Sequence, residues 1–316
     1  MIITDYFRSE PDTTWEIAKA SGITKGTIRL PEHKDFDVTN LAHLKDVCKK
    51  FNDHGIDPII IEPLPNELHD HIKLGDEMRN EAIEKFIALM KNMNTVGIET
   101  VCFNFMAHYG WTRTELDLTE RNSTVTGFKL SSFNDDGFII SREKMWENYE
   151  YFIRAVIPYA EEYGIKLALH PDDPPLDTLG SVGRIFTSLE AIKKGMNIIP
   201  SKNLGVTFCQ ACYHLMGEDL EEAIKALRDK IFFVHFRNTR GCKTDFRETF
   251  HDNGDIDMAR VMRLYMENGI DCPVRVDHVP TMPFEKNSVA GYDALGRLFA
   301  IGYLKGIIEA TERALQ

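Results

Sequence analysis

The sequence predicts a (β/α)8 barrel, the TIM barrel, formed by residues 1–316 as a single domain. Three observations lead to this fold class: helices alternate with strands along the chain, eight strands can be counted, and the length is suitable. The chain has 316 residues, of which 43% are hydrophobic. That composition can bury one large core, and the length falls within the size range of a single barrel. Gly and Pro occur singly at expected element ends, so no linker divides the chain.

The alternation is visible as a repeated junction, in which a polar amphipathic stretch ends in Gly and an Ile follows. The glycines of these junctions are Gly22, Gly55, Gly97, Gly164 and Gly269. A glycine just past a helix end adopts the left-handed conformation that closes the helix, and the apolar residue after it begins the next strand. Helices that alternate with strands imply a parallel sheet.

Eight segments are candidate strands, and several are continuously apolar, as expected for strands covered on both sides. They span residues 2–7, 26–30, 58–62, 98–105, 165–170, 204–208, 231–236 and 273–277. The expected helices between and after them include 41–53, 76–94, 141–162, 220–228, 255–267 and 293–314. Eight repeats of strand and helix are the count of a TIM barrel. A doubly wound open sheet is the alternative, although the first turn lacks a glycine-rich phosphate-binding loop.

The charge and the cysteine count limit the class of partner and the compartment. The formal net charge is −12 at pH 7. A surface this acidic repels phosphate backbones and anionic lipid, so we expect neither nucleic acid nor a membrane as partner. The chain begins without a cationic segment followed by an apolar stretch, and no apolar run approaches about 18 residues. Six Cys without dense pairing are typical of reduced intracellular thiols. We therefore expect a cytoplasmic protein.

Four consecutive candidate strands end in residues that bind metals. These residues are His170, Cys209, His235 and Asp277. Because the active site of a TIM barrel lies at the C-terminal ends of its strands, the four side chains should meet at one rim. Alone, a Cys after an apolar strand is more often a buried hydrophobe, and an Asp there often caps a helix. Together, two imidazoles, a thiolate and a carboxylate predict a site for Mn, Fe, Co or Zn rather than Mg.

Seven segments resemble the signature stretches of the mannonate dehydratase family, in the family's order and over nearly the whole chain. The run from His170 to Pro175, His-Pro-Asp-Asp-Pro-Pro, is the most specific of them. The seven segments span residues 111–116, 170–175, 208–209, 234–238, 250–258, 275–278 and 291–297.

The resemblance implies a barrel related to those of the xylose isomerases and a Mn²⁺ cofactor, with other divalent transition metals as alternatives. It implies removal of water from D-mannonate, a small-molecule sugar acid, to give 2-keto-3-deoxy-D-gluconate. Carried over to this chain, the ligands are His170, Cys209, His235 and Asp277, which are the residues already singled out. His278 and Tyr292 match the residues that transfer protons. Which of the two is the base and which the acid stays open.

Four further residues are predicted to contact the substrate. Arg113 and Arg237 could each bind the substrate carboxylate through two hydrogen bonds, although a surface salt bridge is an equal alternative for Arg113. His251 lies in a segment that matches the family near the substrate, and Asn104 could bind a sugar hydroxyl. Association into a homo-oligomer is a further expectation from the resemblance.

The chain departs from the family pattern around the expected substrate loops. A second His after His278 is absent, Gly110 replaces an acid before Trp111, and the segment between 113 and 141 is shorter than in many members. After Cys209 the family tends to have small residues, whereas this chain has Gln-Ala-Cys-Tyr-His. Metal binding is therefore the firmer prediction, and D-mannonate could be replaced by another aldonate.

Other functions remain as alternatives. An isomerase or epimerase acting on a related sugar needs the same barrel and the same metal. A phosphodiester-cleaving barrel would need a basic groove, which the net charge of −12 disfavours. A barrel that senses a ligand without catalysis is a further alternative. The Cys209-x-x-Cys212 spacing is that of thioredoxin-like redox motifs, but it follows the sixth strand of a barrel rather than the first strand of a redox fold.

Overall fold

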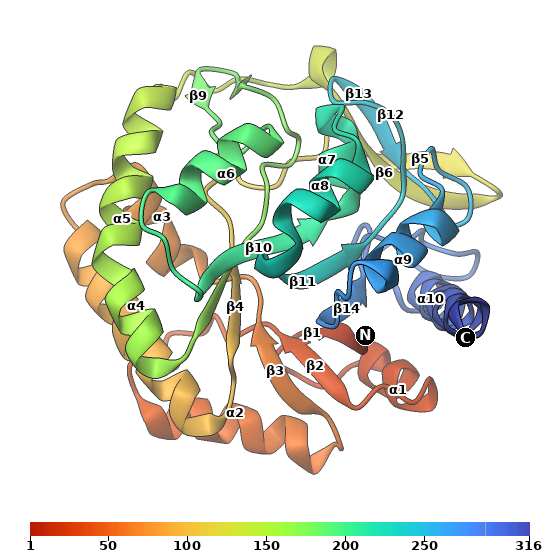
Figure 1. Cartoon of the computed structure of the whole chain (residues 1–316), viewed down its shortest axis with the longest axis horizontal. Coiled ribbons are helices and arrows are strands. Elements are labelled where there is room, and N and C mark those ends of the chain that lie inside the picture. The colour runs from red at the N-terminus through yellow and green to blue at the C-terminus, as the bar shows by residue number, and fades with distance from the viewer. Residues whose placement is uncertain (288) are drawn as a thin grey trace.

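The structure is a computed structural model that describes residues 1–287 and 289–316. Eight parallel strands form a closed barrel in the order β1-β14-β11-β10-β7-β4-β3-β2, and Figure 1 shows helices around them. The barrel strands are β1 (Ile2–Phe7), β2 (Lys25–Ile28), β3 (Asp57–Ile61), β4 (Thr100–Phe103), β7 (Lys166–Leu169), β10 (Leu204–Cys209), β11 (Ile231–Phe236) and β14 (Pro273–Val276). The predicted TIM barrel is confirmed, and each predicted strand overlaps one of these eight. The doubly wound alternative is excluded because the sheet closes.

The five glycine junctions have the conformation that the sequence predicts. Their φ angles are 72°, 77°, 83°, 68° and 69° for Gly22, Gly55, Gly97, Gly164 and Gly269. Only glycine adopts this region without a steric penalty, so each junction ends its helix and turns the chain into the next barrel strand. At the junction that starts β7, Ile165 donates its backbone N–H to the carbonyl of Ala160, which ties the strand to the helix before it.

Ten α-helices and two short 3₁₀ helices occur in the described residues. They are α1 (Thr13–Ala20), α2 (Leu41–Asp53), α3 (Asn66–Leu74), α4 (Arg79–Val96), η1 (Leu130–Ser132), α5 (Arg142–Tyr163), α6 (Leu189–Asn197), α7 (Gln210–Met216), α8 (Leu220–Leu227), η2 (Arg228–Lys230), α9 (Met258–Glu267) and α10 (Ala294–Leu315). The six expected helices correspond to α2, α4, α5, α8, α9 and α10, whereas the expected set lacks α1, α3, α6 and α7. Among the described residues, no helix is long and apolar enough to cross a bilayer.

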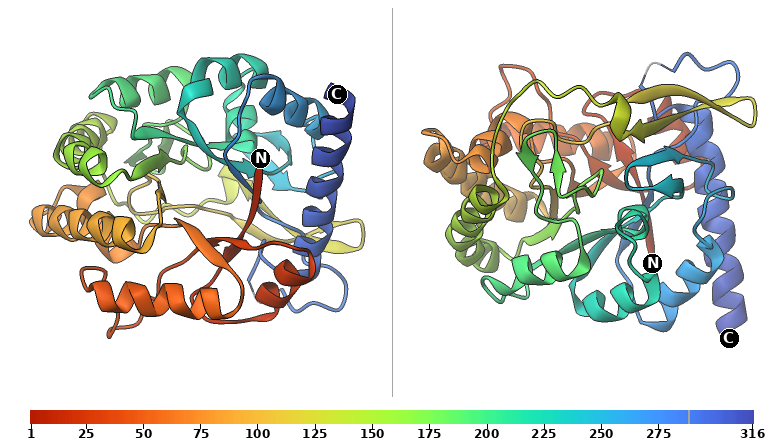
Figure 2. Two further views of the ribbon diagram at one scale, coloured as in Figure 1. Left: turned by 60° about the horizontal axis from the view of Figure 1, so that its bottom comes forward. Right: turned by 90° about the horizontal axis from the view of Figure 1, so that it is seen from above.

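A second, antiparallel sheet lies over one end of the barrel and was not predicted. Its strand order is β12-β13-β6-β5, with bounds β5 (Glu115–Glu120), β6 (Ser123–Lys129), β12 (Thr239–Cys242) and β13 (Asp245–Glu248). A two-stranded pair joins β8 (Thr178–Leu179) to β9 (Val182–Gly183). The β5–β6 hairpin follows β4, and the β12–β13 hairpin follows β11, so both extend the C-terminal ends of barrel strands. The right-hand view of Figure 2 shows the yellow β5–β6 hairpin at the end of the molecule away from both chain termini.

The core lies between the barrel and its helices. Aromatic side chains fill the space between β4 and α5, where Phe103 packs edge-on against Phe152 with ring centroids 5.8 Å apart. The barrel strands β4 and β10 are buried along their whole length. Burial on both faces explains why these strands read as continuous apolar runs. The polar residues that interrupt the apolar pattern lie at the C-terminal strand ends, where the candidate site is found.

Candidate metal centre

The four predicted ligands lie on four strands that are neighbours in the barrel. His170 follows β7, Cys209 ends β10, His235 is in β11, and Asp277 follows β14. The strand order β7-β10-β11-β14 places them side by side, and Cys209 is paired directly with His235 in the β10–β11 register. The parallel sheet therefore delivers these side chains to one rim, as the position of active sites in this fold requires.

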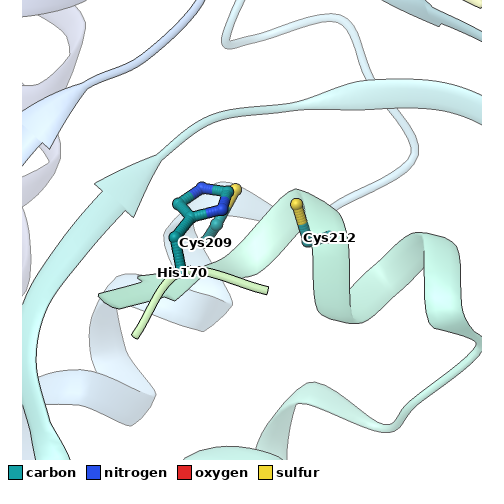
Figure 3. A group of neighbouring side chains, drawn as sticks. All are labelled: His170, Cys209 and Cys212. Carbon is teal, nitrogen blue, oxygen red and sulfur yellow. The ribbon is translucent and has the colours of Figure 1, made fainter. Parts of the chain in front are cut away.

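The donor atoms meet in two groups that share Cys209. Cys209, His235 and Asp277 offer ligand atoms that all lie within 4.8 Å of one another, and His170, Cys209 and Cys212 do the same. Figure 3 shows this second group, with the His170 ring close to the Cys209 sulfur and Cys212 on the helix that follows. The His170 and His235 rings are 5.0 Å apart between centroids. Ligand atoms around a tetrahedral ion are roughly 3.3–3.8 Å apart, so small side-chain shifts would suffice.

The environment favours the anionic form of two of these donors. Burial acts to raise the pKa of the Cys209 thiol, but a hydrogen bond from Cys212 and the charge of Arg237 hold it well below its ordinary value. Burial also opposes ionisation of Asp277, yet the charge of Arg275 holds the pKa of that carboxyl well below its usual range. A buried thiolate, a carboxylate and imidazoles form a donor set that fits a borderline divalent cation.

Each ring nitrogen of His235 lies near a carboxylate without the geometry of a hydrogen bond. Its Nε2 lies 3.0 Å from Glu62 Oε1, and its Nδ1 lies 3.4 Å from Asp277 Oδ2. Burial and the Arg275 charge act to lower the pKa of His235, but the Glu62 and Asp277 charges raise it to about 10. Glu62 directly follows β3 and also pairs with Arg275, whose Nε lies 2.9 Å from Glu62 Oε2. Glu62 therefore lies on the side of the ring where a carboxylate that supports a metal-binding imidazole would lie.

Sequence reasoning missed three residues of this cluster. Glu62 and Cys102 form a third group with His235, again with ligand atoms within 4.8 Å of one another, and Cys212 joins Cys209. Glu62 ends a predicted strand, so its place at the rim was a usable signal. Cys102 lies within β4, where nothing in the sequence distinguishes it from a buried hydrophobe.

The predicted proton-transfer pair lies beside Asp277. The rings of His278 and Tyr292 are 5.1 Å apart between centroids, and His278 Nε2 is 3.6 Å from Asp277 Oδ2. Trp111 stacks on His278 with centroids 4.8 Å apart and an interplanar angle of 11°. Burial lowers the pKa of His278 to about 3 and raises the pKa of Tyr292 well above its ordinary value. His278 is thus a neutral imidazole and Tyr292 a neutral phenol near pH 7.

His278 has a left-handed backbone conformation, with φ at 44°. This region is uncommon outside glycine and is often found where a side chain is held for function. Gly291 packs against the ring, because a Cβ built there would lie 3.1 Å from His278 Nδ1. Gly291 has a φ of 83° itself, so both its small size and its conformation fit this position.

The two predicted substrate arginines form a buried ion-pair network with protein carboxylates. Arg113 contacts Asp173 through Nη1 and Nη2 at 2.8 and 3.0 Å, and it contacts Glu248 through Nε at 3.1 Å. Arg237 contacts Asp173 at 2.8 Å and Glu248 at 3.2 Å, and lies 3.5 Å from Asp277. Both arginine side chains are fully buried, so Arg113 does not form a surface salt bridge.

The other two predicted substrate residues make hydrogen bonds to the backbone. His251 is fully buried and its Nε2 lies 2.8 Å from the Phe236 carbonyl oxygen at the end of β11. Burial lowers the pKa of His251 to about 4. Asn104, just after β4, accepts a hydrogen bond from the Met106 backbone N–H at 3.1 Å. Contact of these residues with a substrate stays a prediction.

One groove is lined by Tyr292 of the proton-transfer pair but not by His278. It has a volume of about 460 Å³ and is lined by Tyr6 and Tyr292, with Arg8 and Arg297 among its charged residues. A larger groove of about 830 Å³ lies between residues 31–38 and 65–85 and contains none of the predicted site residues. The buried donor atoms, rather than groove size, therefore identify the candidate site.

Comparison with known proteins agrees with this geometry. The sequence model described as "D-mannonate dehydratase (UxuA)" matches residues 6–137 and 138–316. A mannonate dehydratase of Streptococcus pneumoniae (strain 70585) is 30% identical over 349 aligned residues, covering 98% of this chain and 93% of that relative. One of Streptococcus agalactiae serotype III (strain NEM316) is 32% identical, with 94% and 93% covered.

Solved structures give the same result. The crystal structure of mannonate dehydratase from Streptococcus suis serotype 2 superposes with a TM-score of 0.90 at 30% identity, covering 100% of this chain and 94% of that one. A D-tagatose 3-epimerase-like protein superposes at 0.67 with 14% identity, which is a likeness of fold alone. The family resemblance of the sequence motifs is thus confirmed by independent comparisons, and this chain belongs to the mannonate dehydratase family.

Proposed function

We propose that this chain is a metal-dependent hydro-lyase that converts D-mannonate to 2-keto-3-deoxy-D-gluconate and water. One observation carries the proposal: the His278–Tyr292 pair lies directly beside the buried group Cys209, His235 and Asp277. A hydro-lyase needs a proton acceptor and a proton donor next to a site that stabilises negative charge. Family membership supplies the substrate, since the relatives of this chain are named mannonate dehydratases.

We assign the metal to four ligands, His170, Cys209, His235 and Asp277. Their chemistry fits the group, because the buried cluster combines sulfur, nitrogen and oxygen donors. When bound there, a divalent cation supplies Lewis-acid stabilisation of the charge that develops on the substrate carboxylate. The resemblance to the family favours Mn²⁺ for this role.

His278 and Tyr292 divide the proton transfers between them. The hydrogen on C2, beside the carboxylate, leaves as a proton to His278, and its electron pair forms the C2–C3 double bond. The C3–oxygen bond breaks, and the Tyr292 hydroxyl protonates the departing hydroxide to water. The resulting enol gains a proton at C3 and becomes the 2-keto acid. We propose this direction because a neutral imidazole can accept a proton and a neutral phenol can donate one.

The surroundings of His278 support its role as the base. Its Nδ1 is buried and has no hydrogen-bond partner within the described residues. The stacked Trp111 ring limits the ring to one plane. An imidazole fixed in this way meets the geometric demand of general base catalysis without a search over rotamers.

We assign the substrate carboxylate to Arg237 before Arg113. Arg237 Nη2 is buried and has no hydrogen-bond partner among the residues that the structure describes, whereas both Arg113 Nη atoms bind Asp173. A guanidinium with N–H groups left unbonded beside Asp277 is suited to an incoming carboxylate. Asn104 and His251 are the further residues we assign to substrate binding. We also propose a single-domain, cytoplasmic enzyme of hexuronate breakdown, which could form a homo-oligomer.

The test is incubation of the Mn²⁺-loaded protein with D-mannonate. We expect a 2-keto acid that reacts with semicarbazide and has lost the mass of one water. A product of unchanged mass would instead show an isomerase or epimerase, and no product from any aldonate would favour a sensor. In deuterated solvent, Tyr292→Phe should still exchange the C2 hydrogen while losing elimination, and His278→Asn should lose both. Tyr303→Phe, a change on α10, is the matched control and should keep both activities.

A further inference from the structure

Cys212 lies where a metal ligand would lie, although the motif around it departs from the family pattern. Its sulfur, the Cys209 sulfur and a His170 ring nitrogen are all within 4.8 Å of one another. Cys209 ends β10 and Cys212 is the third residue of α7. Residues three apart at a helix start lie on one face, so the short helix places Cys212 beside Cys209 (Figure 3).

The two sulfur atoms of this group are buried away from solvent. Cys209 and Cys212 are both 0% exposed. A buried Cys is commonly a small hydrophobe, but that role does not require its sulfur to face a second sulfur and an imidazole. Three soft or borderline donors that converge in a buried position are what a thiophilic cation requires.

The third donor has a defined tautomer. His170 Nδ1 lies 2.7 Å from the carbonyl oxygen of Pro171. Because that carbonyl can only accept, the neutral ring carries its proton on Nδ1 and its lone pair on Nε2. A hydrogen bond of this kind, from the far nitrogen to a backbone carbonyl, is the usual support of a metal-binding imidazole.

We propose that Cys212 is a second thiolate ligand of the cation assigned to Cys209, so that His170, Cys209 and Cys212 together favour a thiophilic divalent cation such as Zn²⁺. The inference rests on the proposed function only in that both assign a cation to Cys209. Two thiolates make the centre softer than one with a single sulfur ligand. The centre should therefore bind Zn²⁺ and Co²⁺ more tightly than Mn²⁺, and the difference in affinity should exceed the one that these ions show at sites without a second sulfur ligand.

The test counts sulfur ligands without measuring activity. The full chain is loaded with Co²⁺, and the thiolate-to-cobalt charge-transfer absorption in the near ultraviolet is recorded. We expect Cys212→Ser to lose about half of the wild-type intensity and to bind Zn²⁺ at least about tenfold more weakly, since even outer-shell changes cost that much. Cys48→Ser, a buried thiol on α2, is the matched control and should change neither value.

Two further measurements keep the proposal testable if the Ser variant does not fold. Cys212→Ala keeps an apolar side chain at the position and should show the same loss of intensity. X-ray absorption of the Zn²⁺-loaded wild-type protein should find two sulfur neighbours at about 2.3 Å. One sulfur neighbour, an unchanged spectrum in the Cys212 variants, or no cobalt binding by the wild type would overturn the inference.

These outcomes separate the inference from the proposed function. If Cys212 variants keep the full spectrum and the wild type dehydrates D-mannonate, Cys212 is no ligand but the function stands. If two sulfurs bind the metal and neither D-mannonate nor another aldonate is dehydrated, the ligand assignment stands and the function fails.

Discussion

Replacement of Arg113 by Met tests whether its network serves the fold or the substrate. The guanidinium contacts Asp173 at 2.8 and 3.0 Å and Glu248 at 3.1 Å. The three side chains are exposed by 0%, 0% and 2%. The Met side chain fills a similar volume but carries no charge. The buried carboxylates of Asp173 and Glu248 then keep Arg237 as their one remaining cation in this network. We expect a large loss of stability.

The magnitude follows from the burial of these charges. Removal of one partner of a buried ion pair costs about 3–5 kcal/mol. The unfolding entropy of roughly 2.1 cal/mol/K per residue gives about 0.7 kcal/mol/K for this chain, so Tm should fall by roughly 5–8 °C. Arg121→Met is the control, because Arg121 and Asp252 pair on the surface with 43% and 34% exposure. Exposed pairs contribute about 0–1 kcal/mol, so that variant should melt within about 1–2 °C of wild type.

The effect has a defined pH dependence. Burial acts to raise the pKa of Asp173, but the charges of Arg113 and Arg237 hold it well below its ordinary value. A carboxyl whose folded pKa is depressed stabilises the fold above its unfolded pKa of about 4 and loses that contribution as the pH falls below it. The Tm difference between wild type and Arg113→Met should thus be full at pH 7 and shrink in acid. If Arg113→Met melts like wild type while KM for D-mannonate rises, the side chain binds substrate and the stability argument is wrong.

Three further predictions concern the surroundings of the proposed base and the buried histidine. Gly291→Ala should destabilise the fold by about 1–3 kcal/mol and lower kcat, because the new Cβ would lie 3.1 Å from His278 Nδ1 and the φ of 83° is strained for Ala. Urea unfolding measures the loss of stability, and steady-state kinetics measure kcat. Trp111→Ala should lower kcat with little change in Tm, because the ring that stacks on His278 is itself 38% exposed; an equal loss in Tm would point to a structural role. His251 is buried and neutral, so the free energy of unfolding should fall by about 3 kcal/mol in total as the pH is lowered from about 6.5 to the folded pKa of about 4. In His251→Phe, urea unfolding should show a free energy that changes less over this pH range.

The barrel was predictable because its signals are local. Each of the five Gly junctions is a two-residue signal, and strands such as β10 are apolar along their whole length. The antiparallel sheet was not predictable by the same means. β6 pairs with β13, where Phe128 lies opposite Phe246, and these residues are more than a hundred positions apart. Nothing local in either segment specifies that partner, so their strand character depends on a tertiary contact.

The candidate site divides in the same way. The convergence of the four proposed ligands was predictable because a residue at a strand end needs only the barrel to place it. The partners of Arg113 and Arg237 were not, because Glu248 ends β13 of the unpredicted sheet. Without Glu248, the sequence indicates for Arg113 either a substrate contact or a surface salt bridge, whereas the structure gives it two buried carboxylates. Contacts that come from loops and added strands need the fold before they can be inferred.

The charges around the candidate centre favour a divalent cation. Five buried groups carry negative charge when the Cys209 thiol is ionised; these are Glu62, Asp173, Cys209, Glu248 and Asp277. Three buried guanidinium groups face them, those of Arg113, Arg237 and Arg275. Two negative charges are thus left over, of which a proton on His235, whose pKa is raised to about 10, offsets one in the metal-free protein. A cation that takes the place of this proton must balance both, and uncompensated charge in a buried site is costly.

A bound divalent cation should therefore stabilise the fold strongly. At a concentration of about 1,000 times its Kd, a ligand of the folded state adds about 4 kcal/mol, which is roughly 6 °C in Tm for a chain of this size. Zn²⁺ or Mn²⁺ should produce this rise, and NaCl at equal ionic strength should not, because screening reaches a buried cluster poorly. Cys209→Ser should abolish the rise, whereas Cys48→Ser should keep it. An equal effect of NaCl, or no effect of any divalent cation, would mean that the protein balances these charges itself, with a proton on His235 and another on a carboxyl group.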